Sequence, residues 1–342
     1  MKALVLEAYN KFDFNEVANP VISDDEVLVE VKAVGICGSD VHGMDGSTGR
    51  RIPPIIMGHE ASGRIITCGK NVDNWKSGDR VTFDSTIYKL EDWYTLNGHY
   101  NLSDNRTVLG VSCNEFRRDG AFAQYIAIPH HILHRIPENV TFEQAALVEP
   151  VAVALHAVNL SGIKLNDTAV VFGAGMIGLF IIQLLKQAGC TVIAVDILEE
   201  KLEMAKKAGA DLILNSLTDD LLAKIRKLTR GRGADCAFEA VGISETINSA
   251  ISSLRKGATL VLVGNLSPSI DFPLQKVVTG ELTIKGSCAI NGEYPTVLEL
   301  ISKGKIDVDS MISNVVPLSE GATYFKKLYN KEPGLLKVIL KP

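Results

Sequence analysis

Residue types that bind metal ions occur in three separate short segments of the sequence. Residues 37–42 read Cys-Gly-Ser-Asp-Val-His, and His59-Glu60 and Glu149-Pro150 follow at a distance. Thiolate, imidazole and carboxylate groups suit zinc, and a catalytic zinc keeps one coordination position open for water or substrate. The segments are too scattered for a zinc finger, so a fold would have to assemble such a site. Taken singly, such a cysteine is more often a small buried apolar residue, so the indication comes from the segments together.

A second chemistry is indicated by a glycine-rich motif in the middle of the chain. Residues 173–178 read Gly-Ala-Gly-Met-Ile-Gly, directly after an apolar run and at the start of a helical pattern. This is the context of a dinucleotide-binding loop, whose glycines permit a tight turn, approach of the backbone to a pyrophosphate, and close packing of helix on strand. The helix N-terminus offers unpaired N–H groups to the phosphates. The predicted cofactor-binding residues of this loop are Gly173, Gly175, Met176, Ile177 and Gly178.

Asp196 is predicted to recognise the sugar of the same cofactor. It ends the strand that follows the helix, 18 residues after Gly178. A carboxylate at that place accepts hydrogen bonds from the adenosine ribose hydroxyls and repels a 2′-phosphate. The next four residues are Ile-Leu-Glu-Glu, with no arginine among them. We therefore expect NAD rather than NADP.

The sequence around these motifs predicts two domains with different patterns of apolar residues. Up to about residue 150, short apolar runs are separated by Gly, Pro and Asp, and residues 27–34 alternate with period two as a half-buried strand does. From residue 168 onward, apolar strands alternate with amphipathic helices, which predicts an α/β fold with a doubly wound parallel sheet. A helix at 295–303 follows, and the apolar run at 335–340 could return to the first domain.

Composition excludes several classes of protein. The chain has 342 residues, of which 46% are hydrophobic and 22% charged, with a net charge of −5, so it is neither disordered nor a nucleic-acid binder. No segment reaches the roughly 18 apolar residues of a membrane span, and the N-terminus has no signal-peptide pattern, so we expect a cytoplasmic protein. Six widely spaced cysteines indicate reduced thiols.

The complete motif set resembles the zinc-dependent medium-chain dehydrogenase/reductase family, and most closely its sorbitol (L-iditol) and polyol dehydrogenase branch. The motifs are the segment 37–42, Gly58-His59-Glu60, Gly-Asp-Arg-Val at 78–81, Glu149-Pro150 and the loop 173–178. The resemblance covers essentially the whole chain. It implies a GroES-like β-barrel catalytic domain over residues 1–152, to which 292–342 returns, and an NAD-binding Rossmann domain over 153–291.

The resemblance also implies a set of zinc ligands. Cys37 and His59 match the first two ligands of the catalytic zinc. Glu60 matches a carboxylate that ligates zinc in the sorbitol dehydrogenase branch and sits behind it in other branches. Glu149 stands where alcohol dehydrogenases have a second cysteine, and it is expected to bind zinc directly or through water.

Three further residues are assigned by the same resemblance. Asp40 matches a carboxylate that orients the ligating imidazole. Ser39 matches the hydroxyl that hydrogen-bonds the substrate alcohol, and His42 matches the outer proton acceptor. Together with Glu60 and Glu149 as acidic groups, they imply zinc- and NAD-dependent oxidation of a secondary alcohol of a polyol, of the sorbitol or L-iditol kind, to a ketose.

The sequence departs from the family pattern at two places. The family often holds a second, structural zinc with four cysteines, so their absence predicts one catalytic zinc and no structural zinc. Sorbitol dehydrogenases usually carry an Arg-Tyr pair that meets the polyol, and Ala289 and Ile290 stand there, which weakens the case for sorbitol itself. The residues at the four cysteine positions are Lys89, Asp92, Thr95 and Ser103.

Other functions remain open at this stage. Within the family, the substrate could be a sugar-alcohol phosphate such as galactitol 1-phosphate, threonine or 2,3-butanediol. The adjacent Arg50 and Arg51 could grip a phosphate, although solvent-exposed charge is the more common role of such residues. Outside enzymes, the alternative is a non-catalytic dinucleotide-binding redox sensor or structural protein. We expect a homodimer or homotetramer that acts on a small molecule, without nucleic-acid or membrane partners.

Overall fold

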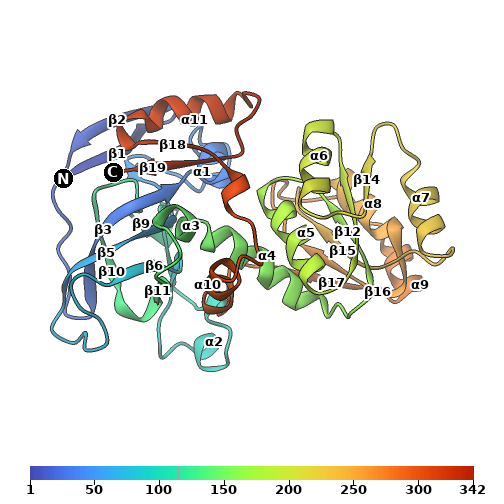
Figure 1. Cartoon of the computed structure of the whole chain (residues 1–342), viewed down its shortest axis with the longest axis horizontal. Helices are drawn as coiled ribbons and strands as arrows, with labels where there is room; N and C mark the ends of the chain where they lie inside the picture. Colours follow the sequence, from blue (N-terminus) through green and yellow to red (C-terminus); the bar gives the residue numbers. More distant parts are fainter. Residues whose placement is uncertain (114–115) are drawn as a thin grey trace. The chain divides into compact units, whose positions relative to one another are not determined.

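The chain divides into two compact units. The computed structural model describes residues 1–113 and 116–342. Unit 1 consists of Met1–Glu149 together with Ile290–Pro342, and unit 2 consists of Pro150–Ala289. Figure 1 labels their helices and strands. Unit 1 is therefore discontinuous in sequence, and unit 2 is inserted into it.

In the described part of unit 1, three β-sheets form the framework. Their strands are β1 (Lys2–Ala8), β2 (Lys11–Glu16), β3 (Glu26–Gly35), β4 (Ile55–Ile56), β5 (Glu60–Cys68), β6 (Arg80–Phe83), β7 (Thr86–Ile87), β8 (Thr107–Leu109), β9 (Arg117–Arg118), β10 (Tyr125–Pro129), β11 (Leu133–Arg135), β18 (Ile312–Pro317) and β19 (Lys337–Lys341). The largest sheet has the order β11-β6-β5-β3-β19-β18, and β10 also pairs with β3. The two smaller sheets have the orders β2-β1-β4 and β7-β8-β9.

Strand β3 is central to the site because it pairs with three neighbours. It runs antiparallel to β5, β10 and β19. Its buried residues alternate with half-buried ones along most of its length, as the period-two pattern predicts. Strand β19 comes from the segment after unit 2, so this segment completes the sheet of unit 1 beside the end of β3.

Short helices connect the strands of unit 1. They are α1 (Gly38–Gly43), α2 (Trp93–Leu96), α3 (Phe142–Ala146), α10 (Tyr294–Ser302) and α11 (Gly321–Tyr329), and α4 (Val148–Ser161) begins in unit 1 and continues into unit 2. The core contains a group of aromatic rings in which Phe325 of α11 packs on Phe12 and Phe122. The return segment thus contributes to the core as well as to the sheet.

Unit 2 is a six-stranded parallel sheet with helices between its strands. The elements are β12 (Thr168–Phe172), α5 (Met176–Gln187), β13 (Thr191–Asp196), α6 (Glu199–Lys207), β14 (Leu212–Asn215), α7 (Leu221–Leu228), β15 (Ala234–Glu239), α8 (Ser244–Ser253), β16 (Leu254–Leu262), α9 (Leu274–Gly280) and β17 (Thr283–Gly286). The strand order is β14-β13-β12-β15-β16-β17, and every adjacent pair is parallel.

This order reverses at β12, and ligands of such sheets bind outside the carboxyl ends of the strands at the reversal point. The glycine-rich motif begins directly after β12. The structure thus confirms the predicted doubly wound parallel sheet. None of the helices that the structure describes combines the length and the apolar composition of a membrane-spanning segment.

Candidate functional site

Cys37 lies between the end of β3 and the start of α1. It is the N-terminal cap of α1, and its carbonyl oxygen accepts hydrogen bonds from the N–H groups of Asp40 and Val41 at 3.0 and 3.1 Å. These bonds fix the backbone from which the thiol projects. Burial raises the pKa of the Cys37 thiol, and the nearby Glu60 carboxylate raises it further. Binding of a metal ion therefore has to displace the thiol proton.

His59 and Glu60 occupy the start of β5. Gly58 has a φ of +95°, and a Cβ atom there would lie 2.9 Å from the ring of Phe122, so only glycine fits this turn. Glu60 pairs with Gly35 of β3, where a side chain would overlap the Glu60 carboxylate. Gly58 thus permits the turn that precedes His59, and Gly35 leaves room for the Glu60 carboxylate.

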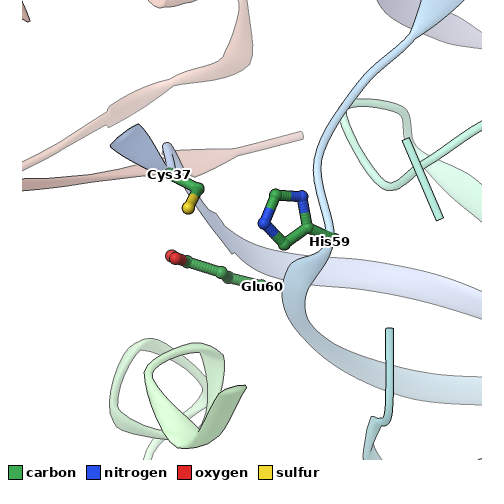
Figure 2. Close-up of side chains that lie close together, drawn as sticks. All are labelled: Cys37, His59 and Glu60. Carbon is green, nitrogen blue, oxygen red and sulfur yellow. The ribbon is translucent and has the colours of Figure 1, made fainter. Parts of the chain in front are cut away.

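Cys37, His59 and Glu60 converge on one point. One ligand atom from each of the three side chains lies within 4.8 Å of the other two. Figure 2 shows the sulfur, the carboxylate and one ring nitrogen of His59 facing a common space. Within residues 1–113 and 116–342, this is the one group of three or more His, Cys, Asp or Glu that meets this criterion. A thiol, an imidazole and a carboxylate at this separation fit a zinc ion.

Asp40 lies next to the imidazole of His59, on the side of Nδ1. Its Oδ2 lies 3.6 Å from Nδ1 of His59, just beyond hydrogen-bond distance, and neither of these buried atoms has a hydrogen-bond partner among the described residues. A metal-ligating histidine usually donates its second ring N–H to a carboxylate, which fixes the ring orientation. With Nδ1 directed at Asp40, the ring nitrogen left for a metal is Nε2.

Arg51 holds the other oxygen of the same carboxylate. Its Nε and Nη2 atoms donate to Asp40 Oδ1 at 3.1 and 2.8 Å, and the Arg51 side chain is only 3% exposed. Arg50 is exposed. The hypothesis of two adjacent arginines gripping a phosphate is therefore wrong for Arg51, because its charge is buried and bound within the protein.

Lys337 of β19 neutralises Glu60. Its Nζ lies 2.5 Å from Glu60 Oε2 and donates to the carbonyl oxygen of Ile36 at 3.0 Å. The side chains of Lys337 and Glu60 are 3% and 1% exposed, so this ion pair is fully buried. Sequence reasoning missed this residue. The available signal was a lysine within the apolar run 335–340.

Glu149 lies near this group but outside the 4.8 Å set. It stands in the first turn of α4, is buried, and accepts a hydrogen bond of 3.4 Å from Ser85 Oγ. Burial raises the pKa of Glu149, the His59 charge opposes this shift, and the charges of Glu60 and Cys37 add to it. The Glu149 carboxylate is thus within electrostatic range of the three converging side chains.

Ser39 and His42 lie on α1 and are both exposed. Ser39 Oγ is 3.3 Å from Cys37 Sγ, so this hydroxyl adjoins the group of ligands. The His42 backbone oxygen accepts a hydrogen bond from Ser47 at 3.0 Å. Ser39 therefore lies beside one of the three converging side chains, whereas His42 lies on the exposed face of the helix.

The glycine-rich loop of unit 2 has the geometry of a phosphate cradle. Gly173 has a φ of +92°, and a Cβ atom there would lie 2.7 Å from Val241. A Cβ atom at Gly178 would overlap the Gly173 carbonyl oxygen, whereas one at Gly175 would meet no atom within 4 Å. Gly175 caps α5 without a side chain, so open space lies in front of the helix N-terminus. Met176 and Ile177 form the first turn of α5 and are half-buried.

Asp196 lies at the end of β13 and is tied to the loop. Its Oδ2 accepts a hydrogen bond from the Ala174 N–H at 2.8 Å, and its Oδ1 accepts from the N–H groups of Ile197 and Leu198 at 2.8 and 3.1 Å. The carboxylate is thus held beside the glycine-rich loop, where a ribose-binding acid is found in this class of sheet.

The Asp92 carboxylate forms hydrogen bonds within the segment where other family members hold a structural zinc with four cysteines. Asp92 Oδ2 accepts hydrogen bonds from the N–H groups of Tyr94 and Thr95 at 2.9 and 3.2 Å. Its Oδ1 accepts from the Asp104 N–H at 3.1 Å. Asp92 thereby caps α2 and links it to residues twelve positions later.

Comparisons with known proteins agree with this description. The family model of the alcohol dehydrogenase GroES-like domain matches residues 23–138, and that of zinc-binding dehydrogenases matches residues 177–303. D-arabitol-phosphate dehydrogenase of Enterococcus avium is 32% identical over 97% of this chain and 94% of its own length. Sorbitol dehydrogenase of Bacillus subtilis strain 168 is 32% identical over 100% of this chain and 97% of its own.

A solved structure with a similar fold is galactitol-1-phosphate dehydrogenase from Escherichia coli. Its TM-score is 0.92 with 30% sequence identity, and the match covers 100% of both chains. Together with the family models, this likeness confirms the expected combination of a GroES-like domain and a Rossmann-type sheet.

Proposed function

Because the chain belongs to the zinc-type alcohol dehydrogenases of the medium-chain dehydrogenase/reductase family, we propose that it oxidises a secondary alcohol of a polyol to a ketose. The proposed cofactors are NAD and one zinc ion. The observation that carries this proposal is the convergence of Cys37, His59 and Glu60 within 4.8 Å. The non-catalytic alternative, a dinucleotide-binding sensor, has no need of such a group.

The proposed roles around the metal follow from the contacts. Cys37, His59 and Glu60 would hold the ion, with Glu149 completing the set directly or through water. Bound zinc would polarise the alcohol oxygen as a Lewis acid, and the nicotinamide would accept the hydride. Because zinc itself compensates acidic charge, Glu60 could exchange its contact with Lys337 for the ion.

Proton removal is proposed to begin at Ser39. Its hydroxyl lies beside the Cys37 sulfur, so an alcohol bound near that atom would be within its reach. His42 lies one turn further along α1 and is exposed, which suits an outer acceptor that passes the proton to water.

NAD is proposed from the glycine-rich loop and Asp196. The bare N-terminus of α5 suits a pyrophosphate, and the Asp196 carboxylate, fixed by the Ala174 N–H, suits the two ribose hydroxyls. The acidic side chains of Glu199 and Glu200 follow within α6 and add no cation for a 2′-phosphate.

The substrate is proposed to be an unphosphorylated polyol. Burial of Arg51 removes one of the two cations that a phosphate could have used. A sugar-alcohol phosphate is the second candidate, because D-arabitol-phosphate dehydrogenase and galactitol-1-phosphate dehydrogenase are among the relatives. Threonine and 2,3-butanediol remain to be compared in the same assay.

The test joins metal analysis to an NAD-reduction screen over polyols, sugar-alcohol phosphates, threonine and 2,3-butanediol. We expect one zinc per chain and turnover with a polyol. Cys37→Ser and His59→Ala should abolish turnover while NAD binding, followed by fluorescence, largely survives. Cys68→Ser, at the far end of β5, is the matched control and should remain active. Normal turnover in a zinc-free Cys37→Ser variant would contradict the proposal, and NAD binding without zinc or turnover would favour the sensor.

A further inference from the structure

We propose that Arg51 is a positioning residue of the metal centre, which sets the orientation of His59 through Asp40. This inference rests on the proposed zinc site. It assigns a role to a buried side chain that is not one of the three converging ligands.

The geometry divides the Asp40 carboxylate between two partners. Two of the three guanidinium nitrogens of Arg51 donate to Oδ1, Nε at 3.1 Å and Nη2 at 2.8 Å. Oδ2 is thereby left to face His59 Nδ1 at 3.6 Å. Because the Asp40 backbone is held in α1, two charge-assisted hydrogen bonds to Oδ1 also fix the direction in which Oδ2 points. The ring of His59 can then approach a metal in one orientation.

Helix α1 leaves space for the Arg51 side chain beside Asp40. Asp40 and Gly43 stand three residues apart on α1 and so lie on the same face of the helix. A Cβ atom at Gly43 would lie 2.5 Å from Arg51 Cγ, so glycine at that position makes room for the aliphatic part of the arginine. Helix α1 therefore offers Arg51 a gap beside the carboxylate that it binds.

The backbone on both sides of Arg51 is also fixed. The Ser112 N–H donates to the Arg50 carbonyl oxygen at 3.2 Å, and the Ser112 hydroxyl accepts a hydrogen bond from the Ile52 N–H. Ser112 thus binds the residue before Arg51 and the residue after it. An arginine that served only as a surface charge would need neither this anchoring nor complete burial.

Arg51 also reaches the proposed start of the proton path. Its Nη2 lies 3.4 Å from Ser39 Oγ. One buried cation thus contacts both the carboxylate behind a metal ligand and the hydroxyl beside the Cys37 sulfur. Loss of Arg51 should disturb the metal and the hydroxyl together.

The experiment compares Arg51→Met, Arg51→Lys and the exposed control Arg50→Met in the full-length protein. Zinc dissociation into a chromogenic chelator and the electronic spectrum of the cobalt-substituted protein are the readouts besides activity. We expect Arg51→Met to weaken zinc binding about 10–100-fold and to alter the cobalt spectrum, as loss of outer-sphere partners does elsewhere. Arg51→Lys should restore part of the affinity, and Arg50→Met should match the wild type.

A double-mutant cycle with Asp40→Asn separates positioning from general damage. If Arg51 acts through Asp40, Arg51→Met causes no further loss of zinc affinity in the Asp40→Asn background. The melting temperature of the double variant should also exceed that of Arg51→Met, because no buried carboxylate is left unpaired. If Arg51→Met does not fold alone, the comparison of Asp40→Asn with the double variant and with Arg51→Lys still decides the question.

Two results would overturn the inference. One is wild-type zinc retention in Arg51→Met, and the other is additive losses of zinc affinity in the cycle. Either result would leave the proposed function standing if the wild type binds zinc and turns over. A wild-type protein that binds no zinc would instead refute the proposed function itself.

Discussion

Replacing Lys337 with methionine should destabilise unit 1 far more than the same change at Lys341 on the same strand. Methionine keeps the unbranched chain and removes the charge. In the metal-free protein this leaves the Glu60 carboxylate buried at 1% exposure without its partner at 2.5 Å. Removal of one member of a buried ion pair costs about 3–5 kcal/mol. The Lys341 pair with Glu143 is 52% and 26% exposed, so its loss should cost at most about 1 kcal/mol.

The two tryptophans of the chain, Trp75 and Trp93, both belong to unit 1. Tryptophan fluorescence during urea unfolding in the presence of a chelator therefore follows unit 1 alone. Adding Glu60→Gln to Lys337→Met should recover most of the loss, because no unpaired charge remains. Zinc should reduce the cost of Lys337→Met, because the ion supplies positive charge near Glu60. Equal effects of Lys337→Met and Lys341→Met would refute this account of the buried pair.

Three further changes test other parts of the structure. Gly178→Ala should destabilise unit 2 by about 1–3 kcal/mol and abolish NAD binding, because the new Cβ overlaps the Gly173 carbonyl oxygen. Gly175→Ala should weaken NAD binding and leave the melting temperature unchanged. A lower melting temperature for Gly175→Ala than for Gly178→Ala, or unchanged NAD binding in both, would count against the assignment of the loop. Burial raises the pKa of Asp84 to about 6, so its contribution to stability falls as the pH rises from the unfolded value of about 4 through 6. The stability of Asp84→Asn relative to wild type should therefore increase by about 2 kcal/mol between about pH 4.5 and 7, and a pH-independent difference in melting temperature would argue against this. Asp92→Ala removes the cap of α2, so the amides of Tyr94, Thr95 and Asp104 should exchange hydrogen about fivefold faster, in line with roughly 1 kcal/mol per helix cap. Unchanged exchange would show that the link is dispensable.

The sequence was most informative for unit 2. Its parallel strands are buried on both faces, so they appear as continuous apolar runs, and β12 and α5 begin where the pattern predicts. The apolar run of β16 starts at Ala258, but the strand itself begins four residues earlier at Leu254, because Arg255, Lys256 and Gly257 interrupt the apolar pattern without ending the strand.

For the site, residue types and motif order indicated Cys37, His59 and Glu60, and the fold brings these three together. The two buried cations could not be placed in the same way. Arg51 follows a loop of Gly, Ser and Thr that is typical of exposed turns, and its partner Asp40 lies eleven residues earlier on a short helix. Lys337 binds Glu60, 277 residues away. Such long-range charge pairing depends on the tertiary fold and has no local pattern.

The discontinuity of unit 1 has a consequence for biosynthesis. Strand β19, with Lys337, emerges from the ribosome only after all of unit 2 has been translated. Until then, nascent unit 1 exposes an unpaired edge at the end of β3 and holds Glu60 without a countercharge. The buried ion pair should therefore form late in translation, and nascent chains arrested within unit 2 should be less stable around Glu60 than the full chain.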